Sequence, residues 1–301
     1  MELGMVGLGK MGANMAERLL KGGHKVVGFD PNADARTLLE SRGSTSADSL
    51  EVLVKALSAP RVVWVMVPSG AITDGTVDKL HELLSEGDTV IDGGNSNYKD
   101  TIRRAASYQD KKINYVDCGT SGGIWGLAEG YSMMVGGDEK AVDAIKPIFE
   151  TLAPGKAQGW GRVGPVGSGH YTKMIHNGIE YGMMQAYAEG FSILKHKTDF
   201  ALDLKQVGDI WRYGSVVRSW LLDLTTEALG KNPEMRGIAP YVVDSGEGRW
   251  TVDAAMELSV SAPVITLSLM ERYRSRDNDS FADKLLASMR NEFGGHAIKT
   301  E

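Results

Sequence analysis

The chain begins with segments typical of a strand, a tight turn and a helix, and this order restricts its fold more than any other feature. Leu3–Val6 is apolar, as a buried strand requires, and Ala13–Lys21 has helical character and ends at two glycines. Between them stands a GxGxxG sequence, formed by Gly7, Leu8, Gly9, Lys10, Met11 and Gly12. In this context the helix N-terminus is aimed at a pyrophosphate, so we expect these six residues to bind a dinucleotide.

An acidic residue follows the second predicted strand. His24–Phe29 is β-rich and ends in Asp30, 18 residues after Gly12. A carboxylate at this distance can accept hydrogen bonds from the 2′-OH of the adenosine ribose, and it would repel a 2′-phosphate. The alternative is a simple turn residue before a proline. We therefore favour NAD as the cofactor, while the nearby Arg36 leaves some use of NADP possible.

Strands and helices alternate through the rest of the N-terminal half, which predicts an α/β domain with a mostly parallel, doubly wound sheet of the Rossmann type. Further strands are expected at residues 62–67, 89–91, 114–118 and 132–135, and helices at 72–84, 98–108 and 139–152.

Three glycine-rich turns follow predicted strands, at residues 68–70, 93–96 and 119–123. Ligands of doubly wound sheets bind beyond the carboxyl ends of the strands, where these turns lie. One such turn often means only a sharp chain reversal, but three together favour a ligand site with accessible backbone N–H groups. We expect Val67, Pro68 and Asn95 to contact the cofactor, and Asn95 and Ser121 to add polar side chains.

Helical periodicity replaces this pattern from His170 onward, after a run rich in glycine at residues 159–169 that we interpret as a domain junction. The predicted organisation is a dinucleotide-binding domain at residues 1–166 and an all-helical domain at 167–301 for substrate binding and oligomerisation. Its helices are expected at residues 171–195, 204–214, 216–229 and 251–275.

The first helix of the second domain has an unusual polar face. Its members lie at i, i+3, i+4, i+7 and i+8 and are Lys173, His176, Asn177, Glu180 and Tyr181. The opposite face is small or apolar and is expected to pack closely against a neighbour; it carries Ile175, Gly178, Ile179 and Gly182. A solvated stripe is the ordinary alternative. This stripe, however, combines a possible base and a possible acid without the Lys/Glu i,i+4 pairing of a solubilising surface.

Composition excludes several functional classes. The net charge of -6 argues against a nucleic-acid or anionic-membrane partner. The single cysteine, Cys118, excludes an internal disulfide and is interpreted as a buried residue. Residues 1–8 suit a strand better than a signal peptide, which predicts a cytoplasmic protein. The six histidines lack metal-ligand spacing, so we expect no catalytic metal.

Three segments of the C-terminal half gather cations, at residues 246–251, 271–276 and 290–296. Arginines scattered along a chain usually lie on the protein surface. Arginine beside glycine, threonine and histidine can instead form a clamp for phosphate or carboxylate. The sequence alone does not show whether these segments converge.

Taken together, five segments resemble decarboxylating 6-phosphogluconate dehydrogenase, in the short bacterial NAD-type form, within the β-hydroxyacid dehydrogenase superfamily. They are residues 7–12, 92–96, 117–123, 173–182 and 293–296, so the resemblance runs from end to end. The Lys-x-x-His-Asn-Gly-x-Glu-Tyr segment is specific to that family. The resemblance implies oxidative decarboxylation of 6-phosphogluconate to ribulose 5-phosphate and CO2 with reduction of NAD, a reaction of the pentose phosphate pathway.

The resemblance also implies residue roles, with Lys173 as general base and Glu180 as general acid. Matching segments make the residues that hold the sugar acid Asn95, Ser121, Gly122, Gly123, His176, Asn177, Tyr181, Arg249, Thr251, Arg274, Arg290 and His296. For the phosphate, ungapped matching selects Arg274, with Arg272 as the alternative. Arg249 stands where many members have lysine. Arg290 and His296 match tail residues that enter the partner subunit's site, which implies an obligate homo-oligomer, a dimer or a tetramer.

Two departures and two alternatives accompany this interpretation. The chain is much shorter than the long animal-type enzymes, and Asp30 replaces the Asn-Arg-Thr type of sequence that holds the 2′-phosphate of NADP. One alternative is a non-decarboxylating β-hydroxyacid dehydrogenase for a small acid such as 3-hydroxyisobutyrate, which would share Lys173 and Asn177 but lack the His-Asn-Gly-Ile-Glu-Tyr run. The other is a dinucleotide-binding sensor that has lost its chemistry.

Overall fold

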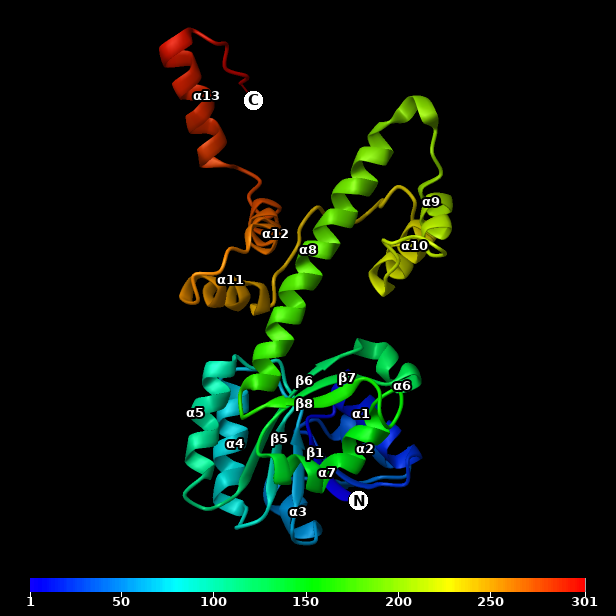
Figure 1. Ribbon diagram of the computed structural model, residues 1–301, viewed down its shortest axis with the longest axis vertical. Coiled ribbons are helices and arrows are strands. Elements are labelled where there is room, and N and C mark those ends of the chain that lie inside the picture. Colours follow the sequence, from blue (N-terminus) through cyan, green and yellow to red (C-terminus); the bar gives the residue numbers. More distant parts are fainter. Residues whose placement is uncertain (301) are drawn as a thin grey trace. The chain divides into compact units, whose positions relative to one another are not determined.

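The computed structural model describes residues 1–300, which form two compact units (Figure 1). The first comprises Met1–His176 and the second begins at Asn177. The domain boundary expected at residues 166 and 167 stays a prediction.

The first unit is built on an eight-stranded sheet in the order β3-β2-β1-β4-β5-β6-β7-β8. Neighbouring strands are parallel except for the antiparallel pair β6 and β7. The carboxyl ends of the first six strands therefore share one edge. The strands are β1 (Glu2–Val6), β2 (Lys25–Phe29), β3 (Thr45–Ala47), β4 (Val62–Val65), β5 (Thr89–Asp92), β6 (Asn114–Ser121), β7 (Ser132–Gly136) and β8 (Trp160–Gly164).

Helices cover both faces of this sheet, which confirms the predicted doubly wound fold. One face packs against α1 (Lys10–Lys21), α2 (Ala33–Glu40) and α7 (Glu139–Leu152); the other packs against α3 (Leu50–Ala56), α4 (Ala71–Leu83) and α5 (Tyr98–Tyr108). The short α6 (Gly126–Glu129) follows the 3-10 turn η1 (Gly123–Trp125).

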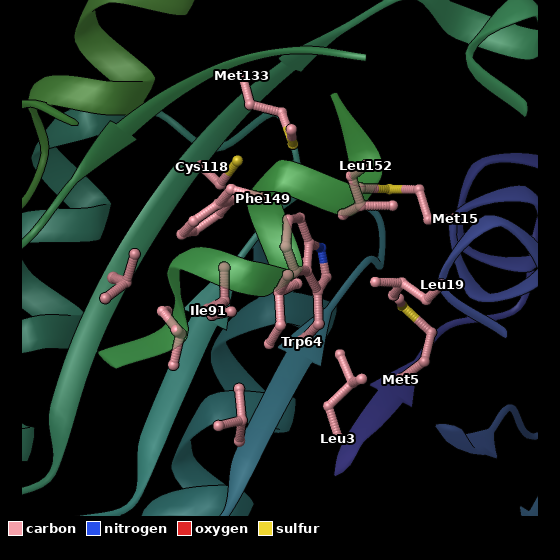
Figure 2. Packing of buried hydrophobic residues seen from close by; sticks show 14 of the residues in the cluster. Leu3, Met5, Met15, Leu19, Trp64, Ile91, Cys118, Met133, Phe149 and Leu152 are labelled. Carbon is pink, nitrogen blue, oxygen red and sulfur yellow. The ribbon is translucent and has the colours of Figure 1, made fainter. Parts of the chain in front are cut away.

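Strand β4 shows why both faces of the sheet are apolar. Trp64 lies in one buried cluster, where its ring centroid is 5.8 Å from that of Phe149 (Figure 2). Its neighbours Val63 and Val65 lie in the cluster on the other face. Because successive side chains of a strand point to opposite faces, an unbroken apolar run predicts a strand covered on both sides.

The lone thiol belongs to the first of these clusters. Cys118 is free and has no exposed surface, and burial raises its pKa to about 12. This agrees with its interpretation as a packing residue, because a nucleophilic cysteine needs an accessible thiolate.

The second unit is helical. Its elements are most of α8 (Ser168–His196), the 3-10 turn η2 (Thr198–Phe200), α9 (Leu204–Trp211), α10 (Trp220–Lys231), α11 (Glu247–Glu257), α12 (Pro263–Arg274) and α13 (Phe281–Gly294). Residues 168–176 of α8 belong to the first unit. None of the helices within residues 1–300 combines the length and apolarity needed to cross a membrane.

Several predicted elements were incomplete or wrong. The single helix expected at residues 251–275 is two helices, because Ser259 has a φ of 57° and Pro263 begins α12. Helix α10 starts only after Ser219, whose hydroxyl caps it by accepting a hydrogen bond from Leu222 N. The sequence also did not predict α2, β3, α3 and α13, or β8 inside the glycine-rich run at residues 159–169.

Candidate active site

The three glycines of the first turn have different structural roles. Gly7 has a φ of 90°, and a Cβ there would lie 2.2 Å from the carbonyl oxygen of Met66. A Cβ at Gly12 would lie 1.9 Å from the Gly7 oxygen. At Gly9, the N-cap of α1, a Cβ would meet no described atom within 4 Å. Gly7 and Gly12 therefore shape the turn, whereas Gly9 leaves open space at a helix N-terminus, which fits a pyrophosphate.

Gly9→Ala is expected to weaken NADH binding about tenfold or more, a loss of roughly 1.4 kcal/mol, with an unchanged Tm. Gly9 has a φ of -61°, which alanine adopts without strain, so the added methyl group only occupies the ligand's space. Gly12→Ala should instead lower the Tm strongly. Fluorescence titration with NADH and thermal unfolding measure both effects, and full NADH affinity in Gly9→Ala would contradict this role.

Asp30 lies beside this turn and is fixed by the backbone. One carboxylate oxygen accepts a hydrogen bond from Leu8 N at 2.8 Å, and the other accepts one from Asn32 N at 2.8 Å. Arg36 donates to the carbonyl oxygen of Asp30 at 2.7 Å. A carboxylate retains further lone pairs after two hydrogen bonds, so Asp30 can still accept from a ribose hydroxyl.

The turns that follow β4, β5 and β6 lie at the same edge of the sheet, because these three strands are parallel. A Cβ at Gly94 would lie 2.9 Å from the carbonyl oxygen of Val67, so two of the turns touch. Pro68 and Asn95 are exposed there, and Ser121 ends β6. Gly122 and Gly123 follow with φ values of 125° and 52°. The structure thus places the residues that the sequence predicted for the first unit at the carboxyl edge of the sheet.

A buried polar network holds the turn that carries Asn95. Arg104 donates to the Ser96 hydroxyl at 3.0 Å and to the Asp92 carboxylate at 3.4 Å. Ser96 and Tyr115 also donate to Asp92, at 3.2 and 3.1 Å. No local pattern predicted the role of Arg104, because a single arginine in a helix is usually a surface residue.

Lys173 is placed by the close packing of α8 on β6. A Cβ at Gly119 would lie 2.3 Å from the Lys173 Cβ, so only glycine fits there. The buried carboxylate of Asp117 accepts hydrogen bonds from Gly167 N at 2.7 Å and His170 N at 2.8 Å, which anchors the start of the helix. Lys173 is only 6% exposed, and its Nζ lies 3.4 Å from His176 Nδ1. An amine is thereby held near the carboxyl end of β6.

Within the second unit, α8 packs tightly on α11. A Cβ at Gly178 would lie 2.6 Å from the Thr251 side chain, and one at Gly248 would lie 2.5 Å from the Tyr181 ring. Tyr181 is buried, whereas Ile179 is 53% exposed. The expectation that Ile179 packs inward was therefore wrong, because the neighbouring helix lies on the side of Gly178 and Tyr181. Asn177 and Glu180 are half-buried on α8.

Arginines from two segments meet near Tyr181. The Arg272 guanidinium lies 3.4 Å from the centroid of the Tyr181 ring. Arg249 and Arg276 lie 5.6 and 4.9 Å from the centroid of the Tyr273 ring. We call Arg249, Arg272 and Arg276 the arginine cluster.

Arg274 lies outside the arginine cluster. Its side chain is 76% exposed and pairs with Glu271 at 2.9 Å. The structure thus brings Arg272, and not Arg274, to Tyr181.

Two family models together match almost the whole chain. Residues 2–162 match the NAD binding domain of 6-phosphogluconate dehydrogenase, and residues 169–297 match the C-terminal domain of 6-phosphogluconate dehydrogenase. The chain belongs to the 6-phosphogluconate dehydrogenase family. This confirms the family suggested by the sequence motifs, and it agrees with the predicted dinucleotide cofactor.

Relatives in this family match the chain over its full length. A putative 6-phosphogluconate dehydrogenase of Bacillus subtilis is 45% identical over 99% of both chains. An NAD(+)-dependent, decarboxylating 6-phosphogluconate dehydrogenase of Haloferax volcanii is 42% identical over 99% of this chain and 98% of its own. The solved structure of Plasmodium falciparum 6-phosphogluconate dehydrogenase has a TM-score of 0.85 at 28% identity, covering 100% of this chain and 66% of that one.

The residues matched to the tail of this family lie on or after α13. Arg290 and His296 are both exposed, and Asn291 donates a hydrogen bond to the His296 carbonyl oxygen at 2.9 Å. Helix α13 also exposes a stripe of apolar side chains, formed by Phe281, Leu285, Leu286 and Met289. Such a stripe is typical of a helix that packs against another protein surface.

Among residues 1–300, no group of three His, Cys, Asp or Glu side chains is arranged to hold a metal ion. The expectation of a metal-independent reaction stays a prediction.

Proposed function

We propose that this member of the 6-phosphogluconate dehydrogenase family oxidises 6-phosphogluconate with NAD and releases CO2, forming ribulose 5-phosphate. The observation that carries the proposal is the buried amine of Lys173, held against β6 close to the glycine-rich turns at the carboxyl edge of the sheet. The 42% identical relative from Haloferax volcanii, named as NAD(+)-dependent and decarboxylating, supports the same reaction.

Bound NAD would supply the hydride acceptor, held by the Gly7–Gly12 turn and by Asp30. Lys173, as a neutral amine, accepts the proton of the substrate 3-OH as C3 is oxidised, which leaves a β-keto acid. The resulting ammonium donates a hydrogen bond to the C3 carbonyl oxygen and stabilises the enediolate that forms as CO2 leaves. Glu180 then protonates the enediolate carbon that lost CO2, which becomes C1 of ribulose 5-phosphate.

For the substrate phosphate we propose Arg272 in place of Arg274, together with Arg249. Arg272 stacks on Tyr181, which the family resemblance already assigns to the substrate, whereas Arg274 is engaged with Glu271 on the surface. A guanidinium binds phosphate oxygens bidentately, so its orientation decides whether it can act.

We further propose a homo-oligomer in which the tail reaches a neighbouring subunit. The apolar stripe of α13 supports this arrangement, because its four large side chains are between 45% and 76% exposed in the single chain. The cytoplasmic location expected from the sequence stays a prediction.

The reaction is tested with purified protein, 6-phosphogluconate and NAD, by measuring NADH and CO2 together. Equal amounts of both are expected. Oxidation without CO2, with faster turnover of 3-hydroxyisobutyrate, would support the non-decarboxylating alternative. Tight NADH binding without turnover of any sugar acid would support a sensor.

The cofactor preference is tested by comparing kcat/KM for NAD and NADP. We expect NAD to be preferred at least about tenfold, because the Asp30 carboxylate repels a 2′-phosphate. Asp30→Asn keeps the shape of the side chain but removes the charge, so it should reduce this preference. A wild-type enzyme that prefers NADP would contradict the role of Asp30.

A further inference from the structure

A short segment before α11 organises the whole arginine cluster. The Val243 carbonyl oxygen accepts a hydrogen bond from Arg272 at 2.8 Å. Asp244 pairs with the other two arginines, and Ser245 N donates to the Tyr181 hydroxyl at 3.2 Å. Three consecutive residues thus hold each member of the cluster and the aromatic ring beneath Arg272.

Asp244 is the centre of this arrangement. Its side chain has no exposed surface, whereas the Arg249 and Arg276 side chains are 54% and 23% exposed. Its Oδ2 accepts from Arg249 Nε at 2.7 Å, and its Oδ1 accepts from Arg249 Nη2 at 3.1 Å and from Arg276 Nη2 at 2.7 Å. One buried carboxylate therefore fixes two more exposed guanidinium groups.

The charges of the surroundings favour an anionic ligand. Three arginines face two carboxylates, Asp244 and the buried Glu247, which is hydrogen-bonded to the Ser245 hydroxyl. Hydrogen bonding from Arg249 and then from Arg276 holds the pKa of Asp244 below its usual range. Asp244 consequently stays charged at neutral pH, and the cluster retains an excess of positive charge.

We propose that Asp244 is a positioning residue that orients Arg249 and Arg276, and through its neighbour Val243 also Arg272, toward a phosphomonoester dianion. This inference rests on the proposed function, in which Arg249 and Arg272 bind the substrate phosphate. Without the carboxylate the guanidinium groups would repel one another and lose their fixed directions.

The same geometry shows why an arginine at position 249 is not equivalent to a lysine. Arg249 uses Nε and Nη2 on Asp244, and its third nitrogen, Nη1, takes no part in this pair. A guanidinium can bind two partners in fixed directions, whereas a lysine ammonium is a point charge on a flexible stem. The arginine at position 249 and the aspartate at position 244 thus form one unit, in which the aspartate fixes the direction of the guanidinium group.

The test compares Asp244→Asn with Glu271→Gln. Each removes one carboxylate charge, but Glu271 pairs with the exposed Arg274 outside the arginine cluster. Asp244→Asn should raise the KM for 6-phosphogluconate at least tenfold, with the KM for NAD unchanged. Glu271→Gln should behave as wild type. An unchanged KM for 6-phosphogluconate in Asp244→Asn would overturn the proposal.

A second measurement separates this inference from the proposed function. Calorimetric titration with inorganic phosphate should show binding to the wild type that is at least tenfold weaker in Asp244→Asn. If the wild type did not oxidise 6-phosphogluconate, the proposed function would fail, and equal phosphate binding by both proteins would still overturn the role of Asp244. If Asp244→Asn did not fold, Arg249→Lys would replace it in the phosphate titration. This variant keeps the positive charge but loses the paired hydrogen bonds to Asp244. A phosphate affinity of Arg249→Lys equal to that of the wild type would overturn the proposal.

Discussion

Lys173→Met is expected to lower kcat for 6-phosphogluconate by a factor of about 1,000 or more. The change removes the amine that, in the proposed mechanism, accepts the 3-OH proton and later stabilises the enediolate, while methionine keeps most of the side-chain length. Lys173 is 6% exposed and its stem lies against Gly119, so an apolar replacement should leave the fold and the Tm nearly unchanged. NADH formation measures the loss of activity, and thermal unfolding measures the stability of the variant.

Lys195→Met is the matched control for this variant. Lys195 lies on the same helix, is 46% exposed and pairs with Glu234 at 2.5 Å. An exposed ion pair contributes little to stability or chemistry, so we expect wild-type kinetics. Turnover of Lys173→Met near the wild-type rate would end the proposed mechanism.

Lys173→Met also tests the proposed role of the tail. Subunits with Lys173→Met and subunits with His296→Ala are each expected to be weakly active alone. If the tail completes a neighbouring site, mixed oligomers contain some sites with both residues intact, and part of the activity should return. Absence of recovery after confirmed subunit exchange would count against a shared site.

Arg272→Met is expected to raise the KM for 6-phosphogluconate about 100-fold, whereas Arg274→Met should change it less than about threefold. Arg272 stacks on the buried Tyr181, so its loss removes a directed cation from the arginine cluster. Arg274 is 76% exposed and pairs with Glu271, one turn earlier on the same helix. Steady-state kinetics with saturating NAD provide the comparison.

The KM for NAD and the Tm serve as controls for both arginine variants. Methionine keeps the apolar stem that packs beside Tyr181, so a general loss of structure is not expected from Arg272→Met. If Arg274→Met produced the large effect and Arg272→Met the small one, the ungapped matching of the sequence would be right and the assignment from the structure wrong.

Local patterns were sufficient to predict most of the first unit. The Gly7–Gly12 turn and the apolar run of β4 are each a pattern of consecutive residues, so they can be recognised in the sequence itself. Short elements were not predicted, because the three residues of β3 are too few to show an alternating pattern and β8 lies within a glycine-rich run. The break between α11 and α12 was also not predicted, although a proline inside the expected helix, Pro263, indicated it.

The sequence by itself determined that Lys173 and Glu180 share one helix, since residues seven apart lie two turns apart on the same side. It could not decide between Arg272 and Arg274, because residues two apart on a helix point roughly 200° away from each other and only the neighbouring elements show which one faces inward. The sequence also could not predict the contact between Asp244 and Arg276, which are far apart in the chain yet lie 2.7 Å from each other. Contacts of this kind depend on how the helices pack, and no local pattern encodes them.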